Sequence, residues 1–144
     1  MDSRNDCIEF FNPATGQKFG EVRMATAADV ACARREMAAV QPEWAAKSVK
    51  ERARLVKKLQ SVIVDAADEI TAVVNQDHGK SRLDALHEVF MTVEKIHHYA
   101  NHAPRWLARE RVPRGLYFFK RFYADREPYG VVGIIGPWNY PIDL

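Results

Sequence analysis

The chain has 144 residues, 47% of them hydrophobic and 28% charged, and its formal net charge is +2. This composition is typical of a globular protein with one modest domain and excludes a disordered chain, while the small net charge favours no class of partner. The start of the chain lacks the basic and apolar regions of a signal peptide, and no apolar run approaches the length of a membrane span. We therefore expect a cytoplasmic protein that does not cross a membrane.

The first predicted element is an amino-terminal β-hairpin. Its strands are expected at residues 8–11 and 19–24, because strand-forming residues there flank the turn signal Asn12-Pro13-Ala14-Thr15-Gly16.

Three or four helices are expected after the hairpin. Thr26 and Asp29 approximate a capping box, and the helix behind them should run from about residue 27 to residue 40, where Gln41-Pro42 ends it.

A second capping box, formed by Ser48 and Glu51, begins the next helix. The apolar pattern continues through residues 70–74, in the same helix or in a separate one, until Gly79 offers a C-cap. The apolar residues that fall on one face of this helix are Leu55, Leu59, Val62, Ile63 and Ala66.

The last helix begins at Ser81, with Asp84 three residues later, and Pro104 should break the chain after it. Its apolar residues recur at alternating steps of three and four, so we expect their face to be buried. They are Leu83, Leu86, Phe90, Val93, His97 and Ala100.

Residues 116–124 are rich in strand formers and carry more aromatic surface than a free sheet edge should show. One alternative is a single-stranded nucleic-acid surface, because basic residues are interleaved with the rings. A nucleic-acid domain would usually be more basic overall, so we favour no nucleic-acid partner. Another alternative is burial of the rings within the subunit. The rings are Tyr117, Phe118, Phe119, Phe122 and Tyr123, and the basic residues are Arg105, Arg109, Arg111, Arg114, Lys120, Arg121 and Arg126.

Residues 131–135 have β-branched side chains without a polar break, which favours a strand buried on both faces of a parallel sheet. Pro137 and Pro141 cannot continue the strand, so the loop from Gly136 to Tyr140 should lie at its carboxyl end, where open α/β sheets bind ligands. The predicted fold class is α/β. A hairpin and helices lead into the first strand of a Rossmann-like parallel sheet that is incomplete at the carboxyl terminus. Without neighbouring strands, this segment should be exposed and should aggregate or bind another chain.

The run Pro128-Tyr129-Gly130-Val131-Val132-Gly133-Ile134-Ile135-Gly136-Pro137-Trp138-Asn139-Tyr140-Pro141 closely resembles the segment that opens the cofactor domain of NAD(P)-dependent aldehyde dehydrogenases. Upstream, the chain is similar to the amino-terminal third of the same family, in order and at the usual spacing. The matching motifs are Asn12-Pro13-Ala14-Thr15-Gly16, Gly20-Glu21-Val22, Ala25-Thr26, Asp29-Val30, Trp44, Glu51-Arg52-Ala53 and Gly79-Lys80.

The resemblance implies a catalytic role for Asn139, whose side-chain amide would donate to the oxyanion formed when a cysteine thiolate attacks an aldehyde. It also implies that Ile135, Gly136, Pro137 and Trp138 lie against the nicotinamide ribose of NAD or NADP. We expect Trp138 and the flanking prolines to fix the asparagine.

From the residues alone, Asn139 is better explained as a turn residue that caps a following helix, with Pro141 in the first turn, and only the family resemblance favours the catalytic role. Gly130 and Gly133 are explained by close packing of a helix on the strand, and they do not follow the Rossmann glycine pattern.

The family's catalytic cysteine and glutamate should both come after Leu144. We therefore expect the chain to be the amino-terminal fragment of an enzyme that oxidises an aldehyde to a carboxylic acid, and to be inactive alone. The alternative is a truncated, non-catalytic chain that acts only through oligomer assembly or binding to a full-length relative.

In the family, the equivalent of residues 116–127 pairs in oligomer assembly, so a homo-oligomer is expected. The predicted division is residues 1–115 for the hairpin and helices, 116–127 for the oligomerisation strand and 128–144 for the start of the cofactor-binding sheet.

Other candidates have weaker support. His98 and His102 stand one helical turn apart, but no third ligand is evident at useful spacing, so we predict no metal site. Cys7 and Cys32 have no Cys-x-x-Cys spacing, and Cys32 lies in a predicted helix without an evident base, so we expect a buried thiol there rather than a nucleophile.

Overall fold

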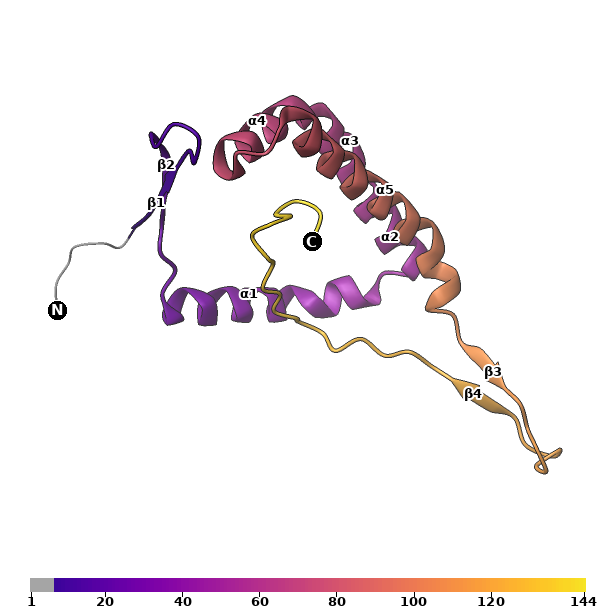
Figure 1. The fold of residues 1–144 in the computed structure, drawn as a ribbon. Coiled ribbons are helices and arrows are strands. Elements are labelled where there is room, and N and C mark those ends of the chain that lie inside the picture. Colours follow the sequence, from indigo (N-terminus) through magenta and orange to yellow (C-terminus); the bar gives the residue numbers. More distant parts are fainter. Residues whose placement is uncertain (1–6) are drawn as a thin grey trace.

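The computed structural model describes residues 7–144, and Figure 1 shows how their helices and strands are arranged. The prediction that the chain opens without a signal peptide falls on residues 1–6 and lies outside the described residues. The elements follow in the order β1 Cys7–Phe11, β2 Lys18–Arg23, α1 Ala27–Ala46, α2 Val49–Lys57, α3 Leu59–Asp65, α4 Ala67–His78, α5 Arg82–Trp106, β3 Glu110–Val112 and β4 Phe122–Ala124.

The amino-terminal hairpin is confirmed, with β1 and β2 paired antiparallel. The Asn12 side chain closes the turn by accepting a hydrogen bond from the backbone N–H of Ala14 at 2.8 Å, as asparagine commonly does in turns. The turn also meets α4, since a Cβ placed on Gly79 would lie 3.1 Å from Cγ of Pro13. Gly79 has a φ of 66°, so it is the left-handed C-cap predicted for this helix.

Helix α1 begins at the predicted Thr26–Asp29 capping box but continues through Pro42 to Ala46. The prediction that Gln41-Pro42 ends the helix is wrong. Proline costs an interior helix one hydrogen bond and crowds the preceding turn, but its fixed φ suits the helix. None of the residues of α1 is buried, so water can reach the carbonyl that Pro42 leaves without a partner.

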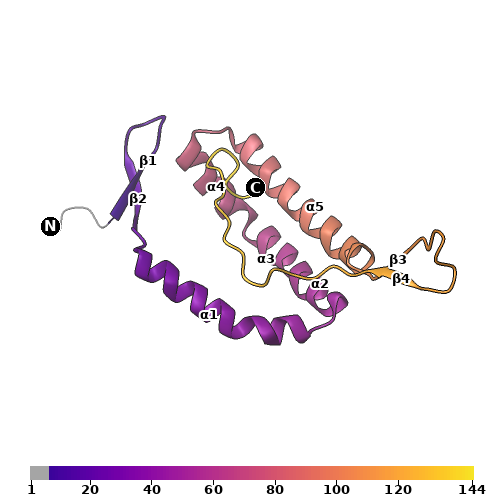
Figure 2. The same cartoon turned by 90° about the horizontal axis from the view of Figure 1, so that it is seen from below.

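Helices α2, α3 and α4 run one after another along α5, and they pack against it (Figure 2). The Ser48–Glu51 capping box is confirmed, because each partner hydrogen-bonds the backbone N–H of the other. Ser81 caps α5, as predicted. Pro104 lies inside α5, which ends at Trp106, so the prediction that this proline breaks the chain is wrong.

The face of α5 that is buried is not the one predicted. Leu83, Leu86 and Phe90 are exposed, although Ala100 is buried. The residues that face the other helices are Ala85, Glu88, Val89 and Ala100, which share a small core with Thr71 and Val74 of α4. The small side chains of Ala85 and Ala100 allow the helices to approach closely, and this leaves the larger apolar side chains of α5 on the outside.

Residues 116–124 are a strand only over their last three residues. β4 pairs antiparallel with β3, with Arg111 opposite Tyr123. The residues before β4 form turns, since the N–H of Tyr117 bonds to the carbonyl of Arg114 and the N–H of Lys120 to that of Tyr117. The prediction of a longer strand is therefore wrong, because the chain must reverse direction here. The β3–β4 hairpin projects away from the helices (Figure 1).

The strand predicted at residues 131–135 is not formed by the described chain, which is irregular there. A buried strand needs a neighbour for its backbone groups, and no described strand lies beside it. Ile134 is 83% exposed and Ile135 fully exposed, which confirms the expectation that this segment is uncovered. The α/β class is confirmed, while the parallel sheet is absent from the described residues.

Candidate functional site

The candidate site is the turn formed by residues 138–143. It lies beside the junction of α4 and α5, where side chains of these helices and of the residues between them form hydrogen bonds with the backbone of the turn. The N–H of Leu144 closes it with a hydrogen bond to the carbonyl of Tyr140 at 3.1 Å. In Figure 1 the chain crosses α1 before it reaches this turn.

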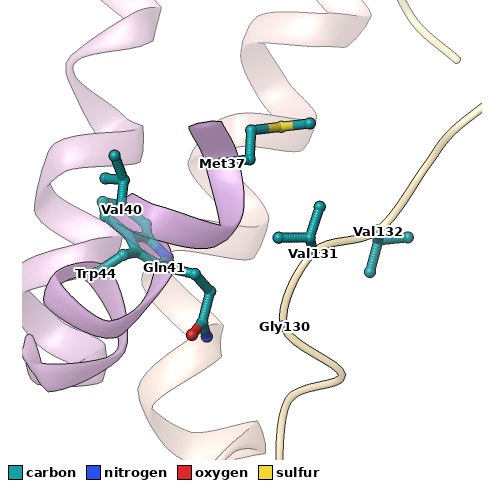
Figure 3. A pocket seen from close by; sticks show the side chains of 7 residues that line it. All are labelled: Met37, Val40, Gln41, Trp44, Gly130, Val131 and Val132. Carbon is teal, nitrogen blue, oxygen red and sulfur yellow. The ribbon is translucent and has the colours of Figure 1, made fainter. Parts of the chain in front are cut away.

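The crossing point is an apolar groove of α1. A cavity of about 310 Å³ lies between α1 and residues 130–132. Figure 3 shows Val131 pointing toward α1 and Val132 pointing away from it. The α1 residues that line the cavity are Met37, Val40, Gln41 and Trp44. None of these side chains has a group that acts in acid–base or nucleophilic chemistry, so this groove positions the segment and is not the candidate site.

Two side chains at the end of α4 and just beyond it hold the start of the turn. A ring nitrogen of His78, Nε2, forms a hydrogen bond with the carbonyl of Trp138. The ammonium of Lys80 donates to the carbonyl of Asn139 at 2.6 Å and lies 4.2 Å from the centre of the Tyr140 ring. The backbone on both sides of the Asn139 side chain is therefore fixed.

Two side chains of α5 hold the end of the turn. Oε1 of Glu88 accepts hydrogen bonds from the backbone N–H groups of Ile142, at 2.8 Å, and Asp143, at 3.3 Å. The ammonium of Lys95 pairs with the carboxylate of Asp143 at 2.7 Å.

Glu88 and Lys80 also pair with each other, with Nζ of Lys80 2.8 Å from Oε2 of Glu88. Burial of Glu88 disfavours its charged form, but the hydrogen bonds from Lys80, Ile142 and Asp143 outweigh this effect, so the pKa of Glu88 lies below its usual value. The carboxylate is therefore ionised at neutral pH.

The candidate site residues lie on one exposed stretch of chain. Asn139 is exposed, and the residues after it form a turn that contains an i→i+4 hydrogen bond, from the N–H of Leu144 to the carbonyl of Tyr140. The described residues therefore do not decide between the helix-capping alternative and the oxyanion role, and both stay predictions. Trp138 is 84% exposed, which means that it does not hold the asparagine as predicted. The contacts from His78 and Lys80 have that role instead. Ile135 is also exposed, and a Cβ added to Gly136 would meet nothing within 4 Å, so the chain's own packing leaves this surface free for a bound group.

Sequence reasoning missed Glu88, Lys80 and His78. The available signal was the helical spacing of Ala85, Glu88 and Val89, which places a carboxylate on a face of small and apolar residues. A buried carboxylate needs donors, and two of the three residues that supply them, Ile142 and Asp143, are 54 and 55 positions away in the sequence.

The histidines and cysteines have structural surroundings that differ in part from the predictions. His102 Nδ1 lies 2.7 Å from the backbone carbonyl of His98, and its ring stacks on Trp106. Within residues 7–144, no three potential metal ligands are grouped together. Cys32 is exposed, not buried as predicted, because α1 packs none of its residues into a core. Cys7 is half-buried in β1.

The part of the chain that the structure describes contains no helix with the length and apolar character needed to cross a membrane.

Comparison with known proteins identifies relatives along the whole chain. The chain is 33% identical over 130 residues to a putative NADP⁺ succinate-semialdehyde dehydrogenase of Mycolicibacterium smegmatis, which covers 90% of this chain and 25% of the relative. The fold of this chain is similar to that of a putative methylmalonate-semialdehyde dehydrogenase of Sinorhizobium meliloti, crystallised with NAD. The TM-score is 0.86 and the identity 30%, over 98% of this chain and 28% of that one.

The fold is also similar to that of an NADP-dependent glyceraldehyde-3-phosphate dehydrogenase of Bacillus halodurans, crystallised with NADP. Here the TM-score is 0.85 and the identity 26%, over 98% of this chain and 30% of that one. The chain spans about a quarter of the length of the curated relative that it matches. The family model described as the aldehyde dehydrogenase family matches residues 1–144, and the chain therefore belongs to the aldehyde dehydrogenase family.

Proposed function

We propose that this chain is the amino-terminal part of an NAD(P)-dependent aldehyde dehydrogenase, which oxidises an aldehyde to a carboxylic acid, and that Asn139 is its oxyanion donor. The observation that carries the proposal is the exposed side-chain amide of Asn139 on a turn whose backbone is fixed by Lys80 and Glu88. A donor that is held in place before the reaction stabilises developing negative charge without reorganisation.

In this proposal, the Asn139 amide N–H donates to the carbonyl oxygen of the aldehyde as a thiolate attacks the carbonyl carbon. The oxygen becomes negatively charged at that step, and the hydrogen bond strengthens. Bound NAD or NADP would then accept the hydride. A relative named for NADP⁺, a similar structure crystallised with NAD and another crystallised with NADP support this choice.

Residues 135–138 are proposed to hold the nicotinamide ribose. Ile135 and Trp138 present exposed apolar surface, and Gly136 leaves space beside the backbone. The space beside Gly136 would let the ribose approach the backbone closely, and the apolar surface would suit the flat nicotinamide ring that the ribose carries.

The thiolate itself is proposed to come from residues outside these 144. Cys7 lies in β1 and Cys32 in α1, whereas the contacts that hold the turn come from the α4–α5 region. The 144-residue chain alone should therefore form no acyl-enzyme and should be inactive.

The test compares the protein expressed from its complete reading frame with the Asn139→Ala variant and with the control Asn101→Ala, which changes an exposed asparagine of α5. The assay is aldehyde-dependent formation of NAD(P)H. Loss of an oxyanion donor should lower kcat on the order of 100- to 1,000-fold while the KM for the cofactor stays the same. A kcat for Asn139→Ala equal to that of the control would refute the role of Asn139, and NAD(P)H formation by the 144-residue chain would refute its inactivity.

A second part of the proposal is assembly into a homo-oligomer through residues 116–127. Leu116 is 92% exposed and Phe118 78% exposed at the tip of the β3–β4 hairpin, which extends away from the helices (Figure 1). Exposed apolar surface of this kind marks a protein interface. The same surface favours the alternative of a non-catalytic chain that acts only through assembly.

The ion pairs of this hairpin support a protein partner over a nucleic acid. Arg109 donates two hydrogen bonds to Asp125, at 2.7 Å and 2.8 Å, and Arg126 pairs with Glu110 at 3.2 Å. Cations that are already paired with carboxylates attract phosphates less strongly. The cytoplasmic location and the division of the chain at residues 115 and 127 remain predictions from the sequence, and β3 places part of the hairpin before the first of these divisions.

A further inference from the structure

We propose that Lys80 and Glu88 are a positioning pair that sets the direction of the Asn139 side-chain amide by holding the backbone of the turn on both sides of it. The inference rests on the proposed role of Asn139 as oxyanion donor. It adds two residues that do not touch the substrate and that act through the turn.

The first step is that the burial of Glu88 is unfavourable in free energy unless its carboxylate is hydrogen-bonded. This residue is only 2% exposed, in the middle of a helix, where a carboxylate is strongly disfavoured unless donors surround it. Lys80, Ile142 and Asp143 supply those donors. Replacing a buried ion pair with apolar residues is often neutral or stabilising, so stability alone gives little reason for such a pair.

The second step is the double contact of Lys80. Its ammonium bridges the buried carboxylate of Glu88, at 2.8 Å, and the carbonyl of Asn139, at 2.6 Å. Glu88 thus fixes the position of the lysine, and the lysine fixes the peptide plane that follows the Asn139 Cα. A rotation of that plane would move the side-chain amide with it.

The third step is that the pair contacts both ends of the turn. Lys80 binds the backbone at Asn139, and Glu88 binds the N–H groups of Ile142 and Asp143. The Asn139 side chain stays exposed between these contacts. The arrangement holds the main chain and leaves the side-chain amide free for a ligand.

The test uses the protein from the complete reading frame, with the variants Lys80→Met and Lys80→Arg. Methionine keeps the length of the side chain but removes the charge, whereas arginine keeps the charge. The control is Lys57→Met, since Lys57 also joins two helices through a hydrogen bond, to Asn101 at 3.1 Å, but on α2 and α5 away from the turn. Each variant is assayed for kcat and KM, and hydrogen–deuterium exchange is measured over residues 138–144.

Lys80→Met should lower kcat roughly 10- to 100-fold with little change in cofactor KM, because the donor is misplaced and not removed. Exchange over residues 138–144 should become faster, and Lys80→Arg should recover most of both properties. Lys57→Met should match the wild type. If Lys80 acts through Asn139, adding Lys80→Met to Asn139→Ala should lower kcat by no more than about twofold further.

The outcomes separate the two proposals. If Asn139→Ala lowers kcat but Lys80→Met changes neither kcat nor exchange, the positioning pair is refuted and the role of Asn139 stands. If Lys80→Met speeds exchange while Asn139→Ala leaves kcat unchanged, the proposed function fails, and with it the catalytic purpose of the pair. Full additivity of the two kcat losses would show that Lys80 does not act through Asn139 and would also refute the inference.

Discussion

The substitution Glu88→Gln tests how much the buried carboxylate contributes to the stability of the fold. Glutamine has nearly the same volume as glutamate, so no cavity is created. The substitution removes the charge, and one end of the new side chain becomes a donor that faces either the ammonium of Lys80 or the N–H groups of Ile142 and Asp143.

The magnitude follows from the contacts of Glu88, which accepts hydrogen bonds from Lys80 and Ile142, each at 2.8 Å, and from Asp143 at 3.3 Å. A hydrogen bond to a charged group contributes about 1.5–3 kcal/mol, and a hydrogen bond between neutral groups contributes about 0.5–1.5 kcal/mol. Weakening the three hydrogen bonds of Glu88 from the first range toward the second therefore costs about 3 kcal/mol. Relief of the desolvation of the carboxylate offsets part of this loss. We expect the free energy of unfolding to fall by about 2 kcal/mol, which lowers Tm by about 6 °C.

The assay is urea unfolding followed by far-UV circular dichroism at several pH values. The pKa of Glu88 is lowered in the folded state, so its contribution is fully present above the unfolded pKa and is lost as pH falls through the folded pKa. The difference between wild type and Glu88→Gln should therefore be constant at neutral pH and should shrink as the pH falls below the ordinary glutamate value of 4.5.

The matched control is Glu94→Gln, because Glu94 is an exposed glutamate of the same helix. It should change the free energy of unfolding by less than about 0.5 kcal/mol. A Glu88→Gln effect as small as that of the control, or an effect that is the same at acid and neutral pH, would contradict the ionised, hydrogen-bonded state of Glu88.

Two further predictions concern the C-cap of α4 and the tip of the second hairpin. Gly79→Ala should lower the free energy of unfolding by about 1–2 kcal/mol through its left-handed backbone. The cost should exceed that of Gly16→Ala, which has a similar φ but no neighbour within 4 Å, because the new Cβ at position 79 would meet Pro13 at 3.1 Å. Equal losses in urea unfolding would show that the Pro13 contact adds nothing. Phe118→Ser should weaken oligomer assembly by about 2 kcal/mol, or roughly 30-fold in dissociation constant, as measured by light scattering over a dilution series. The exposed Val30→Ser change on α1 should leave the mass unchanged, and an unchanged mass for Phe118→Ser would exclude the hairpin as the interface.

Local rules predicted the starts of the helices well. Thr26, Ser48 and Ser81 each accept a hydrogen bond from the backbone N–H three residues later, which depends only on neighbouring residues. The same local rules failed at Pro42 and Pro104, because each helix continues through its proline. At Pro42 the helix has no buried residue, so water can reach the carbonyl that the proline leaves without a partner.

Tertiary features could be predicted only in part. The apolar repeat of α5 was recognised, but the buried face follows Ala85 and Glu88, since close packing with α4 selects small side chains and a carboxylate with distant donors. Residues 131–135 have the composition of a strand, but strand formation requires a partner strand that the described residues do not supply.

The candidate loop was located by sequence, whereas the residues that hold it were not. Asn139 stands in a motif that can be recognised along the chain, but the contacts from His78 and Lys80 join segments about 60 residues apart. The spacing of residue types along the sequence does not predict contacts between segments so far apart. The catalytic role of Asn139 stays a prediction until it is measured.

The hydrogen bond between Glu88 and Ile142 spans 54 residues, which has a consequence for the order of events during synthesis. The contacts among α2, α3, α4 and α5 are local, so this helical unit can collapse soon after α5 leaves the ribosome. At that moment Glu88 already faces the other helices, but its two amide donors are still inside the ribosome. We expect the carboxylate to stay hydrated until residues 142 and 143 emerge, and the native arrangement to form only then.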